Sequence, residues 1–288
     1  MSTQPFDSVK YKAGQRQEWN TTAPRWQDWW QYIEPGLQPI SDRMMELADI
    51  RPGQVVLDVA TGIGEPAVTA ARRVEPLGHV IATDLSSEML TLGRKRVAEL
   101  GLQNIDFREM DAEALTFPEK SFDVILSRLG LMFLSDVQGA LERMRKLLLP
   151  GGRLVAVVWG APQKVPFARL PMEVAMRELQ LPPPAPGMPG VFSLSNADHL
   201  ERILTGAGFA QVQIEPTMLT IEMASAEDYI RFQQAILASF NTMLAKYSAE
   251  QQAKVWQAIL EAARKYTLPD GTFRTENELL LASGRREA

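Results

Sequence analysis

An acidic residue and two glycines, placed at the end of a short apolar segment, form the motif with the clearest chemical meaning. The apolar run Val55–Val59 contains Asp58 and leads into Gly62 and Gly64, after which a helix is expected from Glu65 to Arg73. Glycine has no Cβ, so the backbone of such a turn can approach a ligand closely. The free N–H groups at the helix start can donate hydrogen bonds to that ligand. A carboxylate here would repel a pyrophosphate but would attract an ammonium group.

Further acidic residues stand where the next two strands are expected to end. A second apolar run, 79–83, ends at Asp84, and a third run, 104–108, is followed by Asp111. An acid about twenty residues beyond the glycine turn can accept hydrogen bonds from both hydroxyl groups of a ribose. Asp84 is therefore expected to bind the sugar of a nucleoside.

These residues need a sheet that brings them to one edge. A fourth strand is expected over 121–127 and a fifth over 154–159, after the turn Leu149–Gly152. Strands that alternate with helical segments predict an α/β fold with a parallel sheet. Because ligands of such sheets bind at the carboxyl ends of the strands, the three acidic residues are expected to face one cleft.

The order and spacing of these motifs resemble those of the class I S-adenosylmethionine-dependent methyltransferases, within the branch of ubiquinone/menaquinone-biosynthesis and small-molecule methyltransferases. The matching residues are Asp58-x-Ala60-x-Gly62-x-Gly64, Asp84-Leu85-Ser86 with Met89-Leu90, Asp111-Ala112, Phe122-Asp123 and Leu149-Pro150-Gly151-Gly152. Ala60 stands where glycine is commonest in the family. The resemblance implies a Rossmann-like, seven-stranded, mostly parallel sheet with an antiparallel last strand and helices on both faces. It also implies S-adenosyl-L-methionine as the cofactor.

The resemblance further implies which residues hold the cofactor and the methyl acceptor. In the family, the carboxylate after the third strand and the next backbone N–H contact the adenine. The residues expected to bind the cofactor are Asp58, Ala60, Thr61, Gly62, Gly64, Asp84, Leu85, Met89, Asp111, Ala112 and Ser127. The residues expected to contact the acceptor are Trp26, Arg128, Met132, Trp159 and Phe232.

Methyl transfer from a sulfonium is an in-line displacement, in which an enzyme mainly positions and dehydrates the reactants. We therefore assign no catalytic residue, and oxygen, nitrogen and carbon acceptors all remain open. For Arg128, contact with an acidic group of a ligand and a structural ion pair are both open interpretations. The chain has no cysteine and two histidines. We interpret His79 as a solvated loop residue and His199 as structural. This composition excludes thiolate zinc sites, iron–sulfur clusters and a histidine-rich metal site.

Two other functions are consistent with part of the pattern. An NAD(P)-dependent oxidoreductase would also use Asp84 on a ribose, and a non-catalytic protein with a methyltransferase fold would retain the same motifs. Asp58 and the pair Asp111-Ala112 favour the methyltransferase.

Composition restricts the partners. The chain has 288 residues, 45% of them hydrophobic, and a formal net charge of −5 without a basic run. This charge argues against a nucleic-acid partner, and the apolar runs are shorter than the about 20 residues of a membrane helix. No signal peptide is recognisable. We expect a cytoplasmic enzyme acting on a small molecule, without membrane insertion, and a homodimer is open.

The chain is expected to form a single methyltransferase domain over 1–288. Within it, residues 1–49 form an N-terminal helical lid, 50–160 the cofactor-binding core, and 161–288 the substrate-side half. Trp19, Trp26, Trp29 and Trp30 in the first part either close over the ligand or pack against the sheet, with a hinge expected at Pro35-Gly36.

A helical cap is expected at 225–266, where two helices separate strands over 212–223 and 278–282. An insertion of this length must pack somewhere, and the carboxyl ends of the strands are the natural place. Its apolar residues either line an acceptor site or only pack helix to helix; they are Met218, Met223, Phe232, Phe240 and Met243. The first interpretation predicts an apolar or aromatic acceptor, as in secondary metabolism.

Overall fold

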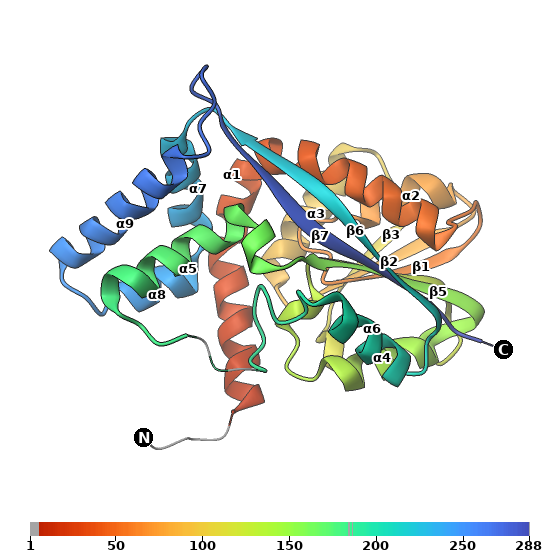
Figure 1. The fold of residues 1–288 in the computed structure, drawn as a ribbon. Helices are drawn as coiled ribbons and strands as arrows, with labels where there is room; N and C mark the ends of the chain where they lie inside the picture. Colours follow the sequence, from red (N-terminus) through yellow and green to blue (C-terminus); the bar gives the residue numbers. More distant parts are fainter. Residues whose placement is uncertain (1–5, 184, 186, 288) are drawn as a thin grey trace.

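A seven-stranded sheet forms the centre of the computed structural model, which describes residues 6–183, 185 and 187–287 (Figure 1). The strands are β1 (Val55–Val59), β2 (His79–Asp84), β3 (Ile105–Glu109), β4 (Phe122–Arg128), β5 (Leu148–Trp159), β6 (Ala210–Met223) and β7 (Phe273–Arg285). Their spatial order is β3-β2-β1-β4-β5-β7-β6. Strands β1 to β5 pair in parallel, and β7 runs antiparallel to both of its neighbours. The predicted mostly parallel sheet is confirmed.

Strand β7 is longer than the segment expected over 278–282. It pairs with β6 from Phe273 opposite Met223 to Arg285 opposite Ala210, so the two form one long hairpin at the sheet edge. The inward-facing residues Thr275 and Asn277 are polar although they are buried, so the apolar alternation typical of a strand is missing before residue 278. Pairing with β6 defines this part of the strand.

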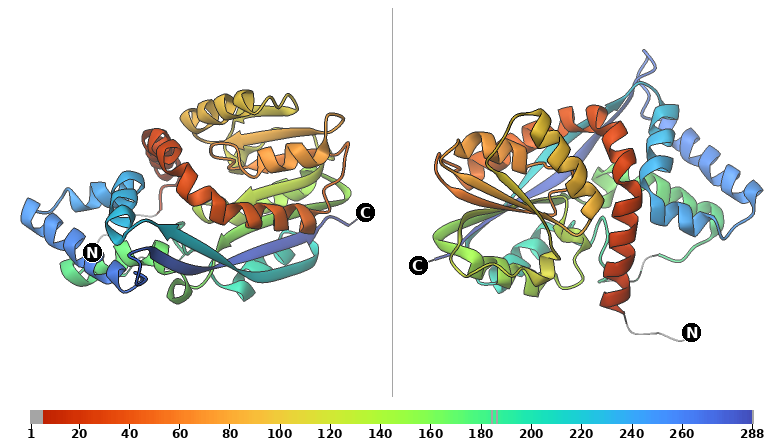
Figure 2. Two further views of the ribbon diagram at one scale, coloured as in Figure 1. Left: turned by 90° about the horizontal axis from the view of Figure 1, so that it is seen from above. Right: turned by 180° about the vertical axis from the view of Figure 1, so that it is seen from behind.

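Helices cover both faces of the sheet (Figures 1 and 2). They are α1 (Ser8–Ala48), α2 (Ala67–Val74), α3 (Ser87–Glu99), α4 (Val137–Leu147), α5 (Pro166–Leu179), α6 (Ala197–Gly206), α7 (Ala226–Ile236), α8 (Ala238–Leu244) and α9 (Ala249–Arg264). Alternate strand residues point to opposite faces. One set, with Val56 and Leu126, packs on α2 and the end of α1. The other, with Leu57 and Ile125, packs on α4 and α6.

The N-terminal segment, expected to be helical with a hinge at Pro35-Gly36, is one helix of 41 residues. It continues through Pro35 and Gly36 but is visibly bent (Figures 1 and 2). A proline inside a helix removes one hydrogen bond and clashes with the preceding turn, which bends the helix without ending it. At Gly36 a Cβ would lie 2.5 Å from the carbonyl oxygen of Thr220, so glycine permits the helix to cross β6 closely. We call residues 8–34, before this crossing, the arm.

The insertion between β6 and β7 contains three helices, α7, α8 and α9, where two were expected. The first expected helix is divided at Leu237, which ends α7 and precedes α8. Together with α5 these helices form a lobe, and the arm lies between this lobe and the sheet (Figures 1 and 2). In the part of the chain that the structure describes, no helix is long and apolar enough to cross a membrane.

Candidate functional site

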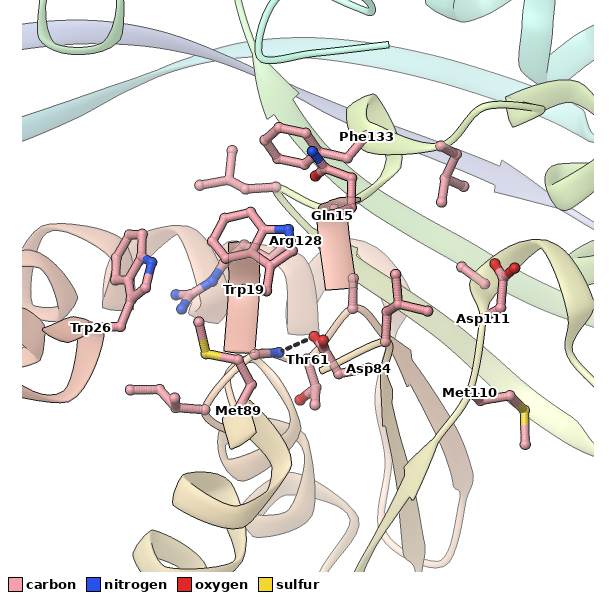
Figure 3. Close-up of a pocket in the computed structure, with 18 of the residues that line it drawn as sticks. Gln15, Trp19, Trp26, Thr61, Asp84, Met89, Met110, Asp111, Arg128 and Phe133 are labelled. Carbon is pink, nitrogen blue, oxygen red and sulfur yellow. Dashed lines mark hydrogen bonds between the residues drawn. The ribbon is translucent and has the colours of Figure 1, made fainter. Parts of the chain in front are cut away.

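A cavity lies between the carboxyl ends of β1, β2 and β4 and the arm (Figure 3). The sheet side of its wall comes from the glycine turn after β1, the end of β2, and the loops after β3 and β4. The arm side contributes Tyr11, Lys12, Gln15, Trp19, Trp26 and Trp30. Polar groups from consecutive strand ends therefore meet an aromatic helix over one shared space.

The glycine turn is held in shape by Asp84. One carboxylate oxygen of Asp84 accepts from the backbone N–H of Gly62 at 2.9 Å, a bond marked in Figure 3. The other oxygen accepts from the backbone N–H of Ser86 at 2.9 Å. Burial raises the pKa of Asp84, and these backbone hydrogen bonds act in the opposite direction. Each oxygen retains a lone pair for a ligand hydroxyl.

Ala60 and Gly62 both adopt left-handed backbone conformations, with φ of 60° and 56°. This region costs little for glycine and about 1 kcal/mol for a residue with a Cβ. The conformation explains why glycine is commonest at the position of Ala60. Ala60 and Gly62 both line the cavity.

Asp58 lies directly under the turn and is completely buried. Its Oδ2 accepts from the backbone N–H of Ala67 at 3.1 Å, while its Oδ1 has no partner among the described residues. Burial raises the pKa of the Asp58 carboxyl to about 7. The hydroxyls of Thr61 and Ser127 are also buried without a described partner. Unpaired buried polar atoms are uncommon, and such a group suggests a site that a ligand completes.

Replacing Asp58 by asparagine is expected to remove part of the pH dependence of stability. The folded carboxyl, with its pKa of about 7 against 3.8 ordinarily, holds a proton that the unfolded chain releases. Its contribution is therefore full below about pH 4 and is lost as the pH rises through 7, on the order of 4 kcal/mol. Denaturant unfolding of the ligand-free protein from about pH 4 to pH 8 measures this. Parallel profiles for the wild type and Asp58→Asn would contradict the expectation.

Asp111 carries an ion pair from the arm. Its Oδ2 lies 2.9 Å from Nζ of Lys12, and its Oδ1 accepts from the backbone N–H of Glu113 at 2.8 Å. Lys12 also pairs with Glu113 at 2.7 Å, and Glu113 in turn accepts from Ser135. Burial acts to lower the pKa of Lys12, but the hydrogen bonds to Glu113 and Asp111 outweigh it and raise that pKa. Lys12 thus fastens the arm across the mouth of the cavity.

The arm is attached on two sides. Toward the sheet, Asn20 accepts from the hydroxyl of Ser86 at 2.7 Å. Toward the lobe, Glu18 accepts from the backbone N–H of Ser239 at 3.0 Å, and Arg25 donates to the carbonyl of Ala235 at 3.1 Å. The insertion therefore holds the arm on the side that faces the lobe.

Arg128, at the end of β4, forms a structural ion pair, which decides between the two interpretations left open above. Its guanidinium makes two hydrogen bonds to the carboxylate of Glu34, at 3.1 and 2.9 Å, and a third to the hydroxyl of Ser41 at 2.8 Å. Both charged side chains are buried. Arg128 also lines the cavity, because its ion pair with Glu34 lies at the end of the cavity next to α1.

The structure gathers most of the residues expected to bind the cofactor. Eight line the cavity, namely Ala60, Thr61, Gly62, Asp84, Leu85, Met89, Asp111 and Ala112. Asp58 and Ser127 are buried and are not part of the lining, and Gly64 faces the ring of Phe107.

The residues expected to contact an acceptor are only partly brought together. Trp26 and Arg128 line the cavity, whereas Met132, Trp159 and Phe232 do not. Met132 is buried in the core on the α4 side of the sheet. Trp159 packs in the core at the end of β5, and Phe232 is buried edge-on against Trp26 and Trp29.

The insertion does not line the cavity with its apolar residues, so the apolar enclosure expected from them is corrected. Met223, Phe232 and Phe240 are buried in helix and sheet packing, Met243 packs against the same core, and Met218 is 54% exposed. The apolar wall comes instead from the arm and the loop after β4, with Trp19 packed edge-on against Phe133.

Several lining residues were missed from the sequence, above all Lys12, Gln15 and Phe133. A signal for those on the arm exists, because Lys12, Gln15 and Trp19 recur at helical spacings of three and four residues and so share one face. Phe133 gives no such signal, since it lies in a short turn after β4.

Comparison with known proteins identifies what the chain resembles. Residues 40–175 match the model of the ubiE/COQ5 methyltransferase family. The ubiquinone/menaquinone biosynthesis C-methyltransferase UbiE of Teredinibacter turnerae is 38% identical over 120 residues, which are 41% of this chain and 48% of that protein. The UbiE protein of Pseudoalteromonas translucida is 42% identical over 115 residues, 40% of this chain and 46% of that protein. The chain thus spans about half the length of the curated relatives it matches.

Solved structures share the fold at low identity. The YcgJ protein of Bacillus subtilis superposes with a TM-score of 0.59 at 20% identity, covering 86% of this chain and 98% of that one. A putative methyltransferase of Bacillus halodurans gives 0.56 at 20% identity, covering 86% and 99%. Phosphoethanolamine N-methyltransferase 2 of Haemonchus contortus, in complex with S-adenosyl-L-methionine, gives 0.53 at 21% identity, covering 85% and 51%. The resemblance to the ubiquinone/menaquinone-biosynthesis methyltransferases that the motifs indicated is confirmed over residues 40–175, and the solved structures confirm the fold.

Proposed function

We propose that this chain is an S-adenosyl-L-methionine-dependent methyltransferase that acts on a small apolar or aromatic metabolite. One observation carries the proposal: the glycine turn, Asp84 and Asp111 meet in a single cavity that an aromatic helix covers. The match to the ubiE/COQ5 family over 40–175 supports it.

The polar groups of the cavity fit the parts of this cofactor in order. Asp111 and the backbone N–H of Ala112 suit the adenine, and Asp84 keeps lone pairs for the two ribose hydroxyls. The unpaired Oδ1 of Asp58 lies under the turn that would receive the methionine moiety, where an ammonium group would complete it. Of these groups, Oδ1 of Asp58 is the one without a described partner. The ribose would share Asp84 with the backbone of Gly62 and Ser86. The adenine would share Asp111 with Lys12.

When bound, S-adenosyl-L-methionine supplies a methyl group already activated by the positive charge on its sulfur. The residues of this chain then have to orient the acceptor and exclude water. The arm suits both tasks, because Trp19, Trp26 and Trp30 present apolar rings to the cavity.

The acceptor is proposed to be apolar because of the remaining cavity wall. Where the proposed contacts to the cofactor leave the wall uncovered, it is aromatic. UbiE relatives are named as C-methyltransferases of ubiquinone and menaquinone biosynthesis, so quinone precursors with a methylatable ring carbon are the first compounds to test. Oxygen and nitrogen acceptors remain open, because no lining residue distinguishes them.

A transfer assay with methyl-labelled S-adenosyl-L-methionine and a library of quinone precursors, phenols and amines tests the proposal. We expect label in a low-mass apolar product, and loss of that product in Asp84→Ala. Label that enters only nucleic acid or protein would contradict the proposed acceptor class. Turnover of NADH by the same preparation, without methyl transfer, would favour an oxidoreductase.

Cofactor binding is expected to order the arm. The arm is joined to the cofactor side of the cavity through Lys12 and Asn20, so a ligand beneath it adds contacts and slows local opening. We expect hydrogen exchange over residues 8–34 to slow when S-adenosylhomocysteine is added, while exchange in α9, away from the cavity, stays unchanged. Slower exchange near Gly62 and Asp84 together with unchanged exchange in the arm would contradict this expectation. It would show that the tryptophans of the arm only pack against the rest of the protein.

A further inference from the structure

The indole nitrogen of Trp26 is a buried hydrogen-bond donor that has no partner among the described residues. Trp26 lines the cavity, and Figure 3 shows its ring beside Met89 with the nitrogen-bearing edge turned toward Trp19 and Arg128. A buried indole N–H usually finds an acceptor, and leaving a donor unpaired costs about 1–3 kcal/mol. This donor is therefore expected to serve a ligand.

Packing locates Trp26 at one end of the cavity. It contacts the cluster of Ala23, Ile63 and Met89, and Ile63 lies within the glycine turn. Figure 3 shows Trp26 and Asp111 on opposite sides of the site. If the adenine lies at Asp111 and the ribose at Asp84, the amino-acid end of the cofactor extends toward Trp26.

That end of the cofactor carries a carboxylate, and the charged donors nearby are already engaged. Arg128 is bound by Glu34 and Ser41. Arg96 pairs with Glu65 through Nη2 at 2.8 Å and lies over the ring of Trp30. Its Nη1 has no described partner, but Arg96 does not line the cavity. Among the described residues that line the cavity, the indole N–H of Trp26 is a buried donor without a partner. The hydroxyl of Thr61 is close enough to the Asp58 carboxyl to lower its pKa, so it is directed at Asp58.

We propose that Trp26 binds the carboxylate of the cofactor's methionine moiety through its indole N–H. This inference rests on the proposed function. It changes the role expected for Trp26 from acceptor contact to cofactor contact. It also makes the arm a direct ligand of the cofactor, because Trp26 lies on the arm between Asn20 and Glu34.

The test compares two ligands on two variants. Trp26→Phe retains an apolar ring against Phe232 but removes the N–H, and Trp29→Phe is a matched control because Trp29 packs on the same Phe232 without lining the cavity. The ligands are S-adenosylhomocysteine and its analogue without the carboxylate. Loss of a hydrogen bond to a charged group should weaken S-adenosylhomocysteine binding about 10- to 100-fold in Trp26→Phe. We expect the analogue to bind both variants and the wild type equally.

Equal weakening of both ligands by Trp26→Phe, or weakening of neither, would overturn the proposal. Failure of the wild type to bind S-adenosylhomocysteine would instead overturn the proposed function. A second measurement needs no variant: among the indole N–H resonances of the six tryptophans, one should move downfield with S-adenosylhomocysteine and not with the analogue. The same shift with both ligands would also refute the carboxylate contact.

Discussion

Replacing Asp84 by alanine is expected to weaken binding of S-adenosylhomocysteine by about 2–4 kcal/mol, roughly 30- to 1000-fold. The variant would lose the proposed charge-assisted bonds to the ribose and also the two bonds that fix the glycine turn and the start of α3. Both losses weaken the binding of S-adenosylhomocysteine, so the total loss of affinity is larger than either would cause alone. Calorimetric titration of the wild type and the variant measures the loss.

Two controls separate these effects. Asp84→Asn retains one acceptor oxygen and removes the charge, so its loss should lie between those of the wild type and alanine. Asp106→Ala changes an exposed acid on neighbouring β3 and should leave affinity unchanged. A loss of less than about twofold in Asp84→Ala would mean that the ribose does not lie at the end of β2.

Replacing Arg128 by methionine is expected to lower the free energy of unfolding by about 3–5 kcal/mol, because it leaves Glu34 buried without its partner. Burial raises the pKa of Glu34, and Arg128 is the main group that opposes this rise. The arginine also holds Ser41 and the carbonyl of Leu37, so its loss loosens the region where α1 crosses the sheet. Urea unfolding measures the change.

The matched control is Arg43→Met. It removes an arginine of α1 whose side chain is 42% exposed and pairs with Glu46 on the same helix and Glu215 on β6. Exposed pairs of this kind contribute about 1 kcal/mol or less. The double variant Glu34→Gln/Arg128→Met should recover part of the stability, since no unpaired charge remains. Equal, small losses for Arg128→Met and Arg43→Met would show that the buried pair does not stabilise the fold.

The core of the site could be predicted from sequence because its residues follow strands that share one edge. Asp84 ends the apolar strand β2, and Asp111 lies two residues after β3; the parallel order of these strands brings their ends together. The buried strands β1, β2 and β4 leave a strong local signal in the sequence. The position of each acid relative to its own strand needs no long-range information.

The contacts of the arm could not be predicted, because they depend on pairs far apart in the chain. Lys12 meets Asp111 across 99 residues, and Arg128 meets Glu34 across 94. Many charged residues could form such pairs, and sequence spacing does not choose among them. The helical face of the arm was recognisable, but the surface it covers was not.

For a related reason, the sequence could not choose between the two interpretations of the insertion, of which the structure favours packing between helices. Phe232 and Phe240 are residues of the kind that line apolar substrate pockets. In this structure they pack among α5, α7, α8 and α9 instead. Composition does not distinguish an apolar wall from an apolar core. The arm lies between the lobe and the sheet. The lobe therefore packs against the arm, on the side away from the cavity.

The most direct test of the central claim is a calorimetric titration of this chain with S-adenosylhomocysteine and, separately, with NADH. A methyltransferase site built from the glycine turn, Asp84 and Asp111 predicts binding of S-adenosylhomocysteine at about −7 to −8 kcal/mol, in the micromolar range, and no binding of NADH. Binding of NADH without binding of S-adenosylhomocysteine would contradict the account and identify the cavity as a nicotinamide site.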